Sequence, residues 1–246
     1  MTSSLVIGGT RGLGREVVKL FSKAGHRVSV IGRRLPVDAD RDIPNTTYWT
    51  ADLADAIQLK RALEQAMIGA GKLSYLVFCQ RYRGEGDNWQ GELDVTLSAT
   101  RLIVDTLSQH FDPSQDRGIV MVSSVYGDRV GDGQDVGYHV GKAGLNQLMR
   151  YYAVNLGRQG IRVNGVTPFT FLKEESKNYY LENQPLHDLY KKIIPLGRMA
   201  TSADSAQVIA FLCSPQAGFI NGQNIYVDGG LSLVWPETIA RKLTSL

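Results

Sequence analysis

Short apolar runs alternate with amphipathic stretches along almost the whole chain. A short apolar run bounded by glycine or polar residues is typical of a strand that is buried on both faces of a parallel sheet. Such runs predict strands at residues 5–7, 28–31, 47–51, 73–79, 118–122, 161–166 and 223–227. Between them, apolar residues recur every three or four positions, which predicts helices at residues 13–24, from just after Asp52 to Gly69, 93–111, 138–157 and 203–212.

This order of elements determines the expected architecture. A strand followed by a helix and then by a parallel strand forms a right-handed βαβ unit. We therefore predict an α/β fold with a doubly wound, Rossmann-type parallel sheet, helices on both faces in three αβα layers, and a single domain over residues 1–246. The stretch 169–198 shows neither the strand pattern nor the helix pattern, and it is too long for an ordinary connection. We therefore interpret it as an irregular lid over the substrate.

The composition of the chain serves mainly to exclude classes of protein and of binding site. With 43% hydrophobic and 21% charged residues the chain has a globular composition, and its formal net charge of +3 gives no reason to expect a nucleic acid partner. No apolar run reaches the length of a membrane span, so we expect no membrane association and a cytoplasmic location. The two cysteines, Cys79 and Cys213, are expected to be core residues, and the four histidines have no metal-ligand spacing, so we expect no metal.

Three of the 26 glycines, Gly8, Gly12 and Gly14, lie between the first strand and the first helix. A tight turn before a helix N-terminus can accept a pyrophosphate, and glycine lets the backbone approach the phosphates closely. The spacing is G-x-x-x-G-x-G, and the alternative is a turn that only connects strand to helix. We expect a dinucleotide to contact Gly8, Thr10, Arg11, Gly12, Leu13 and Gly14.

The end of the second strand reads Gly32-Arg33-Arg34 and carries no carboxylate. An NAD-selective protein usually places an acidic side chain there for the ribose 2′-hydroxyl. Arg33 and Arg11 instead offer two guanidiniums suited to a 2′-phosphate, which predicts NADP (NADPH) as the cofactor. The alternative is that both arginines are solvated on the surface.

Tyr138 and Lys142 form a Tyr-x-x-x-Lys pair on one face of a predicted helix, and Ser123-Ser124 end the preceding strand. Together with the glycine loop, this arrangement resembles the short-chain dehydrogenase/reductase family in its single-domain branch, which includes 3-oxoacyl-acyl carrier protein reductases. The resemblance covers nearly the whole chain. It implies that Asp52-Leu53 lie beside the adenine and that Gly160–Asn164 with Pro168 lead to the nicotinamide, and it extends to the C-terminal segment 222–230.

The resemblance also implies catalytic roles. Tyr138 would be the general acid and base, because the Lys142 ammonium one turn away favours the phenolate. Lys142 would also bind the ribose hydroxyls. Ser124 would hold the carbonyl oxygen, with Ser123 as the alternative.

The sequence departs from the family pattern at three places. Phe78-Cys79-Gln80-Arg81 replaces the family's Asn-Asn-Ala-Gly, Thr96 stands at the helix asparagine that completes the family's proton relay, and Phe169 follows Pro168 where glycine is usual. These departures keep a second hypothesis open, that of a non-catalytic NADP-binding sensor or scaffold.

The preferred hypothesis is an NADPH-dependent enzyme that transfers a hydride between its cofactor and a small carbonyl or secondary alcohol substrate. Arg81 and Arg83 follow the fourth strand and could bind an anionic substrate group, such as that of a 3-oxoacyl thioester or a sugar derivative, with Phe169 near the substrate. The alternative is that both arginines point into solvent and pair with Glu85 or Asp87. Apolar residues on more than one face of the helices 93–111 and 138–157 predict a homo-oligomer, a tetramer or a dimer.

Overall fold

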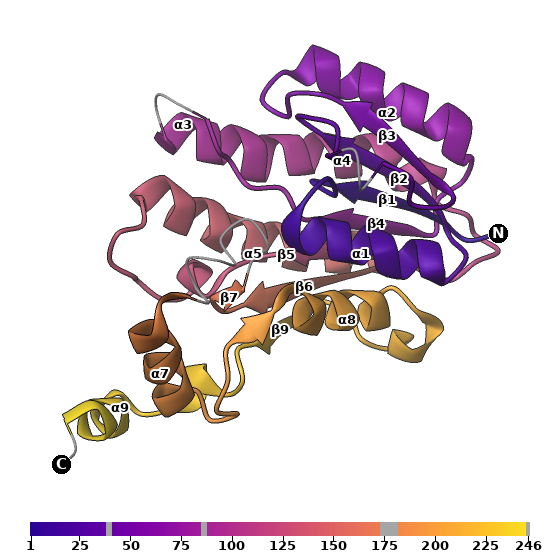
Figure 1. The fold of residues 1–246 in the computed structure, drawn as a ribbon. Coiled ribbons are helices and arrows are strands. Elements are labelled where there is room, and N and C mark those ends of the chain that lie inside the picture. The colour runs from indigo at the N-terminus through magenta and orange to yellow at the C-terminus, as the bar shows by residue number, and fades with distance from the viewer. Residues whose placement is uncertain (38–40, 85–87, 173–181, 245–246) are drawn as a thin grey trace.

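A computed structural model describes residues 1–37, 41–84, 88–172 and 182–244. Seven parallel strands form one sheet in the order β3-β2-β1-β4-β5-β6-β9 (Figure 1). The strands are β1 (Ser3–Ile7), β2 (Arg27–Gly32), β3 (Thr46–Thr50), β4 (Tyr75–Phe78), β5 (Gly118–Val122), β6 (Arg162–Pro168) and β9 (Asn224–Val227). This confirms the predicted doubly wound α/β architecture.

Helices cover both faces of this sheet. Figure 1 shows α1 and α8 on one face and α2, α4 and α5 on the other. The helices are α1 (Gly12–Lys23), α2 (Ala56–Ala70), α3 (Asn88–Leu93), α4 (Ala99–Leu107), α5 (Val136–Gly157), α7 (Gln184–Ile193), α8 (Ser202–Leu212) and α9 (Pro236–Thr244). No helix in these ranges is long and apolar enough to cross a membrane.

The core divides according to the alternation of side chains along each strand. Leu5 and Ile7 of β1 pack among residues of α2, α4 and α5, whereas Val6 packs with α1 and α8. Successive residues of a strand point to opposite faces, so a strand covered on both sides buries all its residues and is mostly apolar, as Leu5–Ile7 of β1 are. All five residues of β1 are buried accordingly.

The position of β1 locates the ligand site. The chain passes from β1 outward to β2 and β3, then returns to place β4 on the other side of β1. The crossovers that leave β1 and β4 therefore diverge, and a crevice opens where the strands end. Ligands of doubly wound sheets bind in that crevice.

Two predicted segments differ from the structure. The helix expected at 93–111 begins earlier, at Asn88, and is interrupted by a π-helical turn, η2 (Asp94–Ser98). The segment 169–198, expected to be irregular, contains the helix α7. Asn183 caps the N-terminus of this helix, because its side-chain oxygen accepts a 3.1 Å hydrogen bond from the Leu186 amide. Residues 173–181 of the expected lid lie outside the described residues, and its flanks form a short parallel pair, β7 (Phe171–Leu172) with β8 (Ala200–Thr201).

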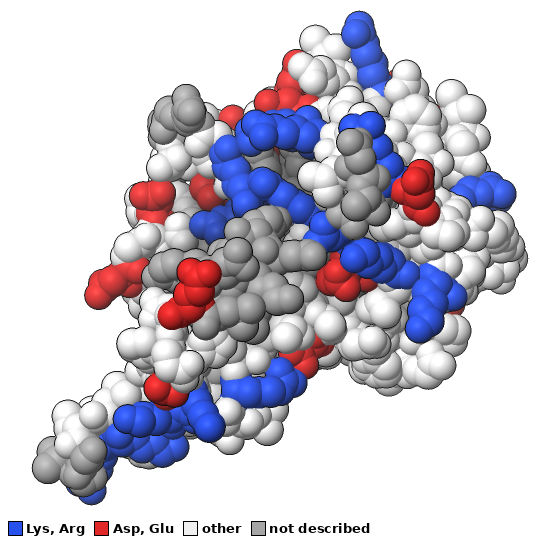
Figure 2. Space-filling view, viewed as in Figure 1, with Lys and Arg blue, Asp and Glu red and all other residues white. Residues whose placement is uncertain are grey.

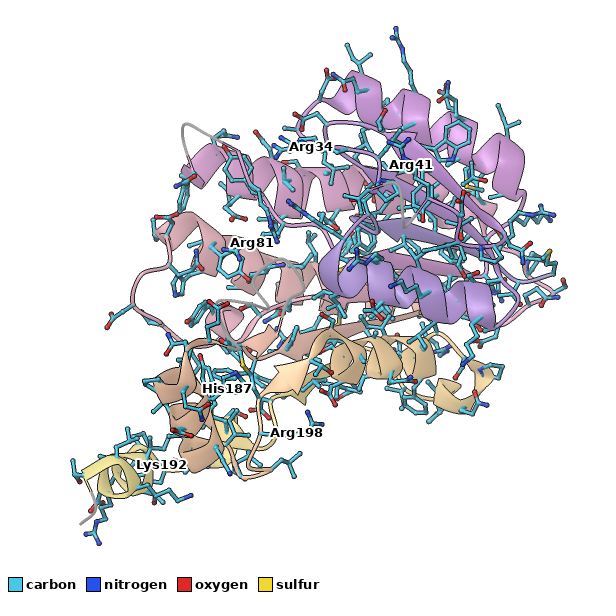
Figure 3. The ribbon with its side chains drawn as sticks, viewed as in Figure 1. Arg34, Arg41, Arg81, His187, Lys192 and Arg198 are labelled. Atoms are coloured by element: carbon cyan, nitrogen blue, oxygen red, sulfur yellow. The ribbon has the colours of Figure 1, made fainter. Side chains whose placement is uncertain are left out.

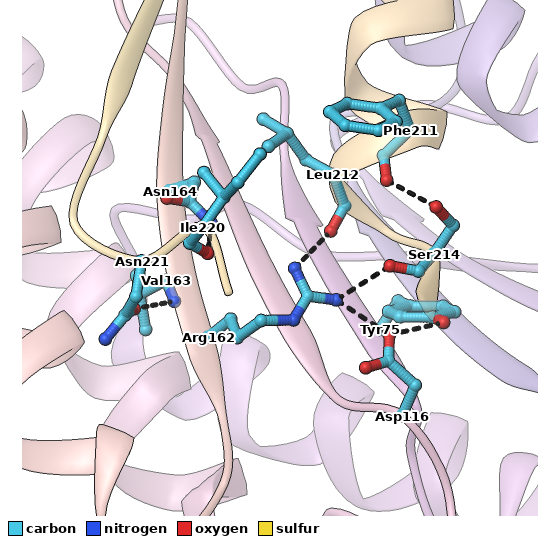
Figure 4. Close-up of polar contacts among 10 residues, drawn as sticks. All are labelled: Tyr75, Asp116, Arg162, Val163, Asn164, Phe211, Leu212, Ser214, Ile220 and Asn221. Atoms are coloured by element: carbon cyan, nitrogen blue, oxygen red, sulfur yellow. Dashed lines mark hydrogen bonds and ion pairs between the residues drawn. The ribbon is translucent and has the colours of Figure 1, made fainter. Parts of the chain in front are cut away.

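Arg162 joins three elements at the amino edge of the sheet, opposite the crevice (Figure 4). Its guanidinium forms a 2.7 Å ion pair with Asp116 and donates hydrogen bonds to the carbonyls of Leu212 and Ser214. Asp116 also accepts a 2.9 Å hydrogen bond from the Tyr75 hydroxyl. The buried arginine thereby connects β6 to the end of α8 and to the segment before β5.

Candidate active site

A cavity of about 900 Å³ opens at the carboxyl edge of the sheet. Its walls come from the segments that follow six strands, together with residues of α3, η2 and α5. The lining segments are Gly8 with 10–14, 32–37, 52–54, 79–84, 122–126 and 168–170. The cavity therefore includes every catalytic and cofactor-binding residue that the sequence predicted.

The glycine loop leaves no space for side chains. Gly8 has a φ of +79°, and a Cβ there would lie 2.7 Å from the backbone nitrogen of Gln80. A Cβ on Gly14 would collide with the carbonyl oxygen of Gly8. Helix α1 begins directly after this loop, and no described side chain caps its N-terminus. Its exposed amides and the positive end of its dipole fit a pyrophosphate group, so these residues can hold a dinucleotide.

The cavity as a whole is strongly basic. Five arginines and Lys142 line the cavity against a single carboxylate, Asp52, among the described lining residues. Lysine and arginine side chains gather in an arc on the face seen in Figure 2. Arg33 donates a 2.9 Å hydrogen bond to the carbonyl of Arg83, so the segments after β2 and β4 meet here. Asp52 accepts a 3.0 Å hydrogen bond from the Ala54 amide, and Leu53 lines the wall beside it.

Ser124 caps the short helical turn that follows β5. Its Oγ accepts a 3.2 Å hydrogen bond from the amide of Tyr126. Because that bond uses a lone pair, the hydroxyl hydrogen remains available to a group in the cavity. Ser123 also lines the cavity, and its buried Oγ has no partner among the described residues.

Tyr138 and Lys142 project from the first two turns of α5, as the four-residue spacing predicts. The Lys142 ammonium lies 5.7 Å from the centre of the Tyr138 ring and donates a 2.9 Å hydrogen bond to the carbonyl of Val122. Only 3% of Lys142 is exposed, and this burial lowers the pKa of its ammonium to about 8. Tyr126 packs edge-on against the Tyr138 ring at 6.3 Å.

Arg81 covers the face of the Tyr138 ring. Its guanidinium carbon lies 4.7 Å from the ring centre, and Nη2 donates a 3.2 Å hydrogen bond to the side-chain oxygen of Gln134. Figure 3 labels Arg81 close to the first turns of α5. Arg83 and Phe169 also line the cavity. The suggested alternative partners Glu85 and Asp87 lie outside the described residues.

Two further residues near the site were not predicted from the sequence. Glu92 of α3 is buried beside Thr96, and its carboxylate accepts a hydrogen bond from the Thr96 hydroxyl at 3.3 Å. The predicted helix began at residue 93 and so excluded it, although the four-residue spacing from Thr96 was a usable signal. Cys79 packs against the core, as expected, but it also lines the cavity, and burial raises the pKa of its thiol to about 12.

Other candidate groups form no site in the part of the chain that the structure describes. His26 pairs with the Ser4 hydroxyl at 2.9 Å and stacks on Phe21, so it is a packing residue. Cys213 is buried in the core. The described residues contain no cluster of three histidine, cysteine or acidic side chains that could hold a metal ion.

Known proteins with similar sequences include reductases and dehydrogenases. The sequence model of the family described as enoyl-(acyl carrier protein) reductase matches residues 8–232. The chain is 29% identical to the human 3-oxoacyl-[acyl-carrier-protein] reductase over 239 residues, which are 93% of this chain and 97% of that protein. It is 25% identical to D-threitol dehydrogenase of Mycolicibacterium smegmatis, over 94% of this chain and 92% of that protein.

Solved structures of similar proteins have the same fold as this chain. The structure of the TT0495 protein of Thermus thermophilus superposes with a TM-score of 0.83 at 26% identity, covering 95% of this chain and 99% of that one. A short-chain dehydrogenase/reductase of Serratia marcescens, solved as a double mutant, superposes with a TM-score of 0.80 at 26% identity, over 94% and 98% of the two chains.

Proposed function

This chain belongs to the short-chain dehydrogenase/reductase family, and on that premise we propose that it is an NADPH-dependent oxidoreductase of carbonyl groups and secondary alcohols. One observation carries the proposal. Ser124, Tyr138 and Lys142 line the same cavity as the glycine loop, although Ser124 follows β5, Tyr138 and Lys142 belong to α5, and the loop follows β1. A protein that only bound a dinucleotide would have no need for this polar group beside the cofactor.

The three residues can perform the chemistry of carbonyl reduction. A bound reduced nicotinamide would supply the hydride. Ser124 would donate a hydrogen bond to the carbonyl oxygen, and the Tyr138 hydroxyl would give that oxygen its proton as negative charge develops there. Lys142, held by the Val122 carbonyl, stabilises the phenolate that remains on Tyr138.

The choice of NADPH rests on charge. Arg11 and Arg33 line the part of the cavity beside the loop after β2, where no carboxylate is present among the described residues. Guanidiniums bind phosphate oxygens with paired, charge-assisted hydrogen bonds. This part of the cavity would therefore favour a ribose 2′-phosphate over a 2′-hydroxyl.

The catalytic assignment is tested by turnover. NADPH oxidation with a panel of ketones and 3-oxoacyl thioesters should be measurable, and Tyr138→Phe should lower kcat on the order of 10²- to 10⁴-fold while NADPH affinity stays nearly unchanged. Tyr151→Phe removes a hydroxyl from the exposed side of the same helix and should keep full activity. NADPH binding with no turnover across the whole panel would favour the non-catalytic sensor or scaffold.

The position of Arg81 supports an anionic substrate. A guanidinium over the Tyr138 ring lies beside the point where the substrate carbonyl must sit, and its hydrogen bond to Gln134 leaves further N–H donors for an anion. A carboxylate, a phosphate or the phosphopantetheine of an acyl carrier has the required charge.

Replacing Arg81 should therefore affect substrate and not cofactor. We expect Arg81→Ala to raise the KM of the true substrate roughly 10- to 100-fold, as loss of one charge-assisted contact does, with NADPH affinity unchanged. Inorganic phosphate should compete with that substrate. Arg150→Ala, on the outer side of α5, is the matched control. An unchanged KM in both Arg81→Ala and Arg83→Ala would mean that neither arginine binds the substrate and that both are solvated surface residues.

A further inference from the structure

Phe169 lies between two cavities. It lines the cavity of about 900 Å³ that contains Tyr138, called here the main cavity, and it also lines a second cavity of about 70 Å³. No other residue among the described lining residues belongs to both cavities. The resembled family usually has glycine at this position, so the aromatic ring that divides the two cavities is a feature of this chain.

The position of Phe169 is fixed from two sides. Its amide donates a 3.2 Å hydrogen bond to the carbonyl of Val227, which continues the pairing of β6 with β9 one residue beyond Pro168. Its ring meets the ring of Tyr190 on α7 edge-on, with the two centres 5.9 Å apart. Because an edge-on pair is a favourable arrangement of aromatic rings, α7 stabilises Phe169 in this place.

The second cavity forms where the chain after α7 meets the end of β9. The amide of Leu196 donates a 3.4 Å hydrogen bond to the carbonyl of Gly229. Gly229 has a φ of +63°, and a Cβ there would lie 2.6 Å from Cγ2 of Ile194, so glycine lets the two segments approach closely. Ile194, Leu196 and Val227 give this cavity an apolar lining.

The charged residues that line the second cavity are bound to other groups of the protein. Arg198 and Asp204 form two hydrogen bonds with each other, of 2.7 and 2.9 Å. The Asp228 carboxylate accepts hydrogen bonds of 2.9 and 2.7 Å from the amides of Gly230 and Ser232. A charged ligand would have to compete with these contacts, whereas an apolar ligand leaves them intact. The second cavity is therefore suited to a hydrocarbon chain.

We propose that Phe169 limits the length of the substrate's carbon chain, because its ring closes the main cavity against the second one. This inference rests on the proposed function. A ketone carbon has two substituents, and with its oxygen at Tyr138 one of them carries the anionic group that Arg81 binds. The other extends toward Phe169 and ends at the ring. The substrate is therefore a ketone with an anionic group on one side and a short hydrocarbon chain on the other.

The volume of the second cavity predicts the size of the effect. Water occupies roughly 30 Å³ in the liquid and a methylene group is of similar size, so a cavity of about 70 Å³ holds about two methylenes. A hydrophobic pocket discriminates by roughly tenfold or more against one methylene that does not fit. Removing the ring should therefore admit chains about two carbons longer, and the space of the lost ring adds to this.

The kinetic test measures kcat/KM under saturating NADPH for 3-oxoacyl thioesters with acyl chains of increasing length. For the unmutated protein, kcat/KM should fall on the order of tenfold for each carbon beyond the length that reaches the ring. Phe169→Gly should move this fall to chains that are longer by about two carbons or more. Phe169→Leu keeps a branched side chain and should move the fall less far, so a second variant tests the same limit.

Ala200 provides the matched control, since it lines the second cavity and not the main one. Ala200→Leu fills the second cavity and should leave the length limit of the otherwise unmutated protein unchanged. Added to Phe169→Gly, it should cancel part of the gain for long chains. An unchanged length limit in both Phe169→Gly and Phe169→Leu overturns the inference, and so does a gain that Ala200→Leu does not reduce.

A binding measurement separates this inference from the proposed function. Failure of the unmutated protein to reduce any carbonyl overturns the proposed function, but straight-chain carboxylates carry the charge and the chain without a ketone. In calorimetric titrations of the NADP complex of Phe169→Gly, each methylene that enters the second cavity should strengthen carboxylate binding roughly fourfold. In the unmutated protein the affinity should stop increasing at a shorter chain. The same dependence on chain length in both proteins refutes the size limit whatever the enzyme does.

Discussion

Single arginine side chains determine the charge of this cavity. Arg11, Arg33, Arg34, Arg81 and Arg83 line it together, and the chain's small net charge of +3 gives no hint of this concentration. Charges arranged in a cavity with low-dielectric walls act more strongly than the same charges spread over a surface. This concentration of positive charge is the physical basis for the proposal of NADPH and an anionic substrate.

Arg33 offers the sharpest test of cofactor choice. We expect NADPH to bind at least tenfold more tightly than NADH, about 1.4 kcal/mol or more. Arg33→Asp should remove or invert this preference, because a carboxylate repels the 2′-phosphate and accepts from a 2′-hydroxyl. Fluorescence titration with both cofactors measures the ratio, with Arg61→Asp on the exposed side of α2 as the charge-matched control. Equal affinities in the unmutated protein would contradict the assignment.

At the scale of elements, strand β6 supports the site from its two ends. It ends at Pro168 in the cavity wall and begins at Arg162 in the polar network of the amino edge. The motif Gly160–Asn164, which the family resemblance associates with the nicotinamide, thus lies at the far end of the strand from the cavity. Its direct contribution is to hold β6 against α8 and β5.

Loss of that network should destabilise the fold without changing the site. Arg162→Met removes the ion-pair partner of Asp116 and the donor to the carbonyls of Leu212 and Ser214, and we expect the free energy of unfolding to fall by about 3 kcal/mol. Urea denaturation measures this. Arg150→Met on the surface of α5 should stay within about 0.5 kcal/mol of the unmutated protein. A similarly small effect for Arg162→Met would show that the network contributes little.

At the scale of the whole molecule, α5 leaves an apolar stripe uncovered. Val140, Tyr151 and Val154 recur on one side of the helix, and Val154 is 77% exposed. A stripe of this kind on a helix that also carries Tyr138 and Lys142 would join subunits next to their active sites. We therefore expect a homotetramer with two-fold axes.

Light scattering at micromolar concentration should give about four times the chain mass, as a tetramer with closed symmetry requires. Val154→Arg should reduce it, because a charge in an apolar contact is desolvated without a partner. Ile68→Arg on α2, where the isoleucine is 86% exposed but off this stripe, should leave the mass unchanged. A monomeric mass for the unmutated protein would contradict the prediction.

The sequence by itself determined the fold, the cavity's place and its principal residues. The periodicity of apolar residues indicates which stretches are buried strands or helices. This local information was enough to predict the seven strands and the helices that connect them. The glycine loop could be placed because it lies between the first strand and the first helix. Ser124, Tyr138 and Lys142 were identified through their combination with that loop, which resembles the family pattern.

Only the tertiary structure decided which distant side chains meet. Arg81 lies on the Tyr138 ring, and Glu92 is buried against α5 through Gly141, because helices from different crossovers pack together at the carboxyl edge. Glutamate is usually a solvated surface residue, so the local sequence gave no reason to single out Glu92. Burial of a polar side chain depends on what packs over it, and periodicity along one segment carries no information about the segment that covers it.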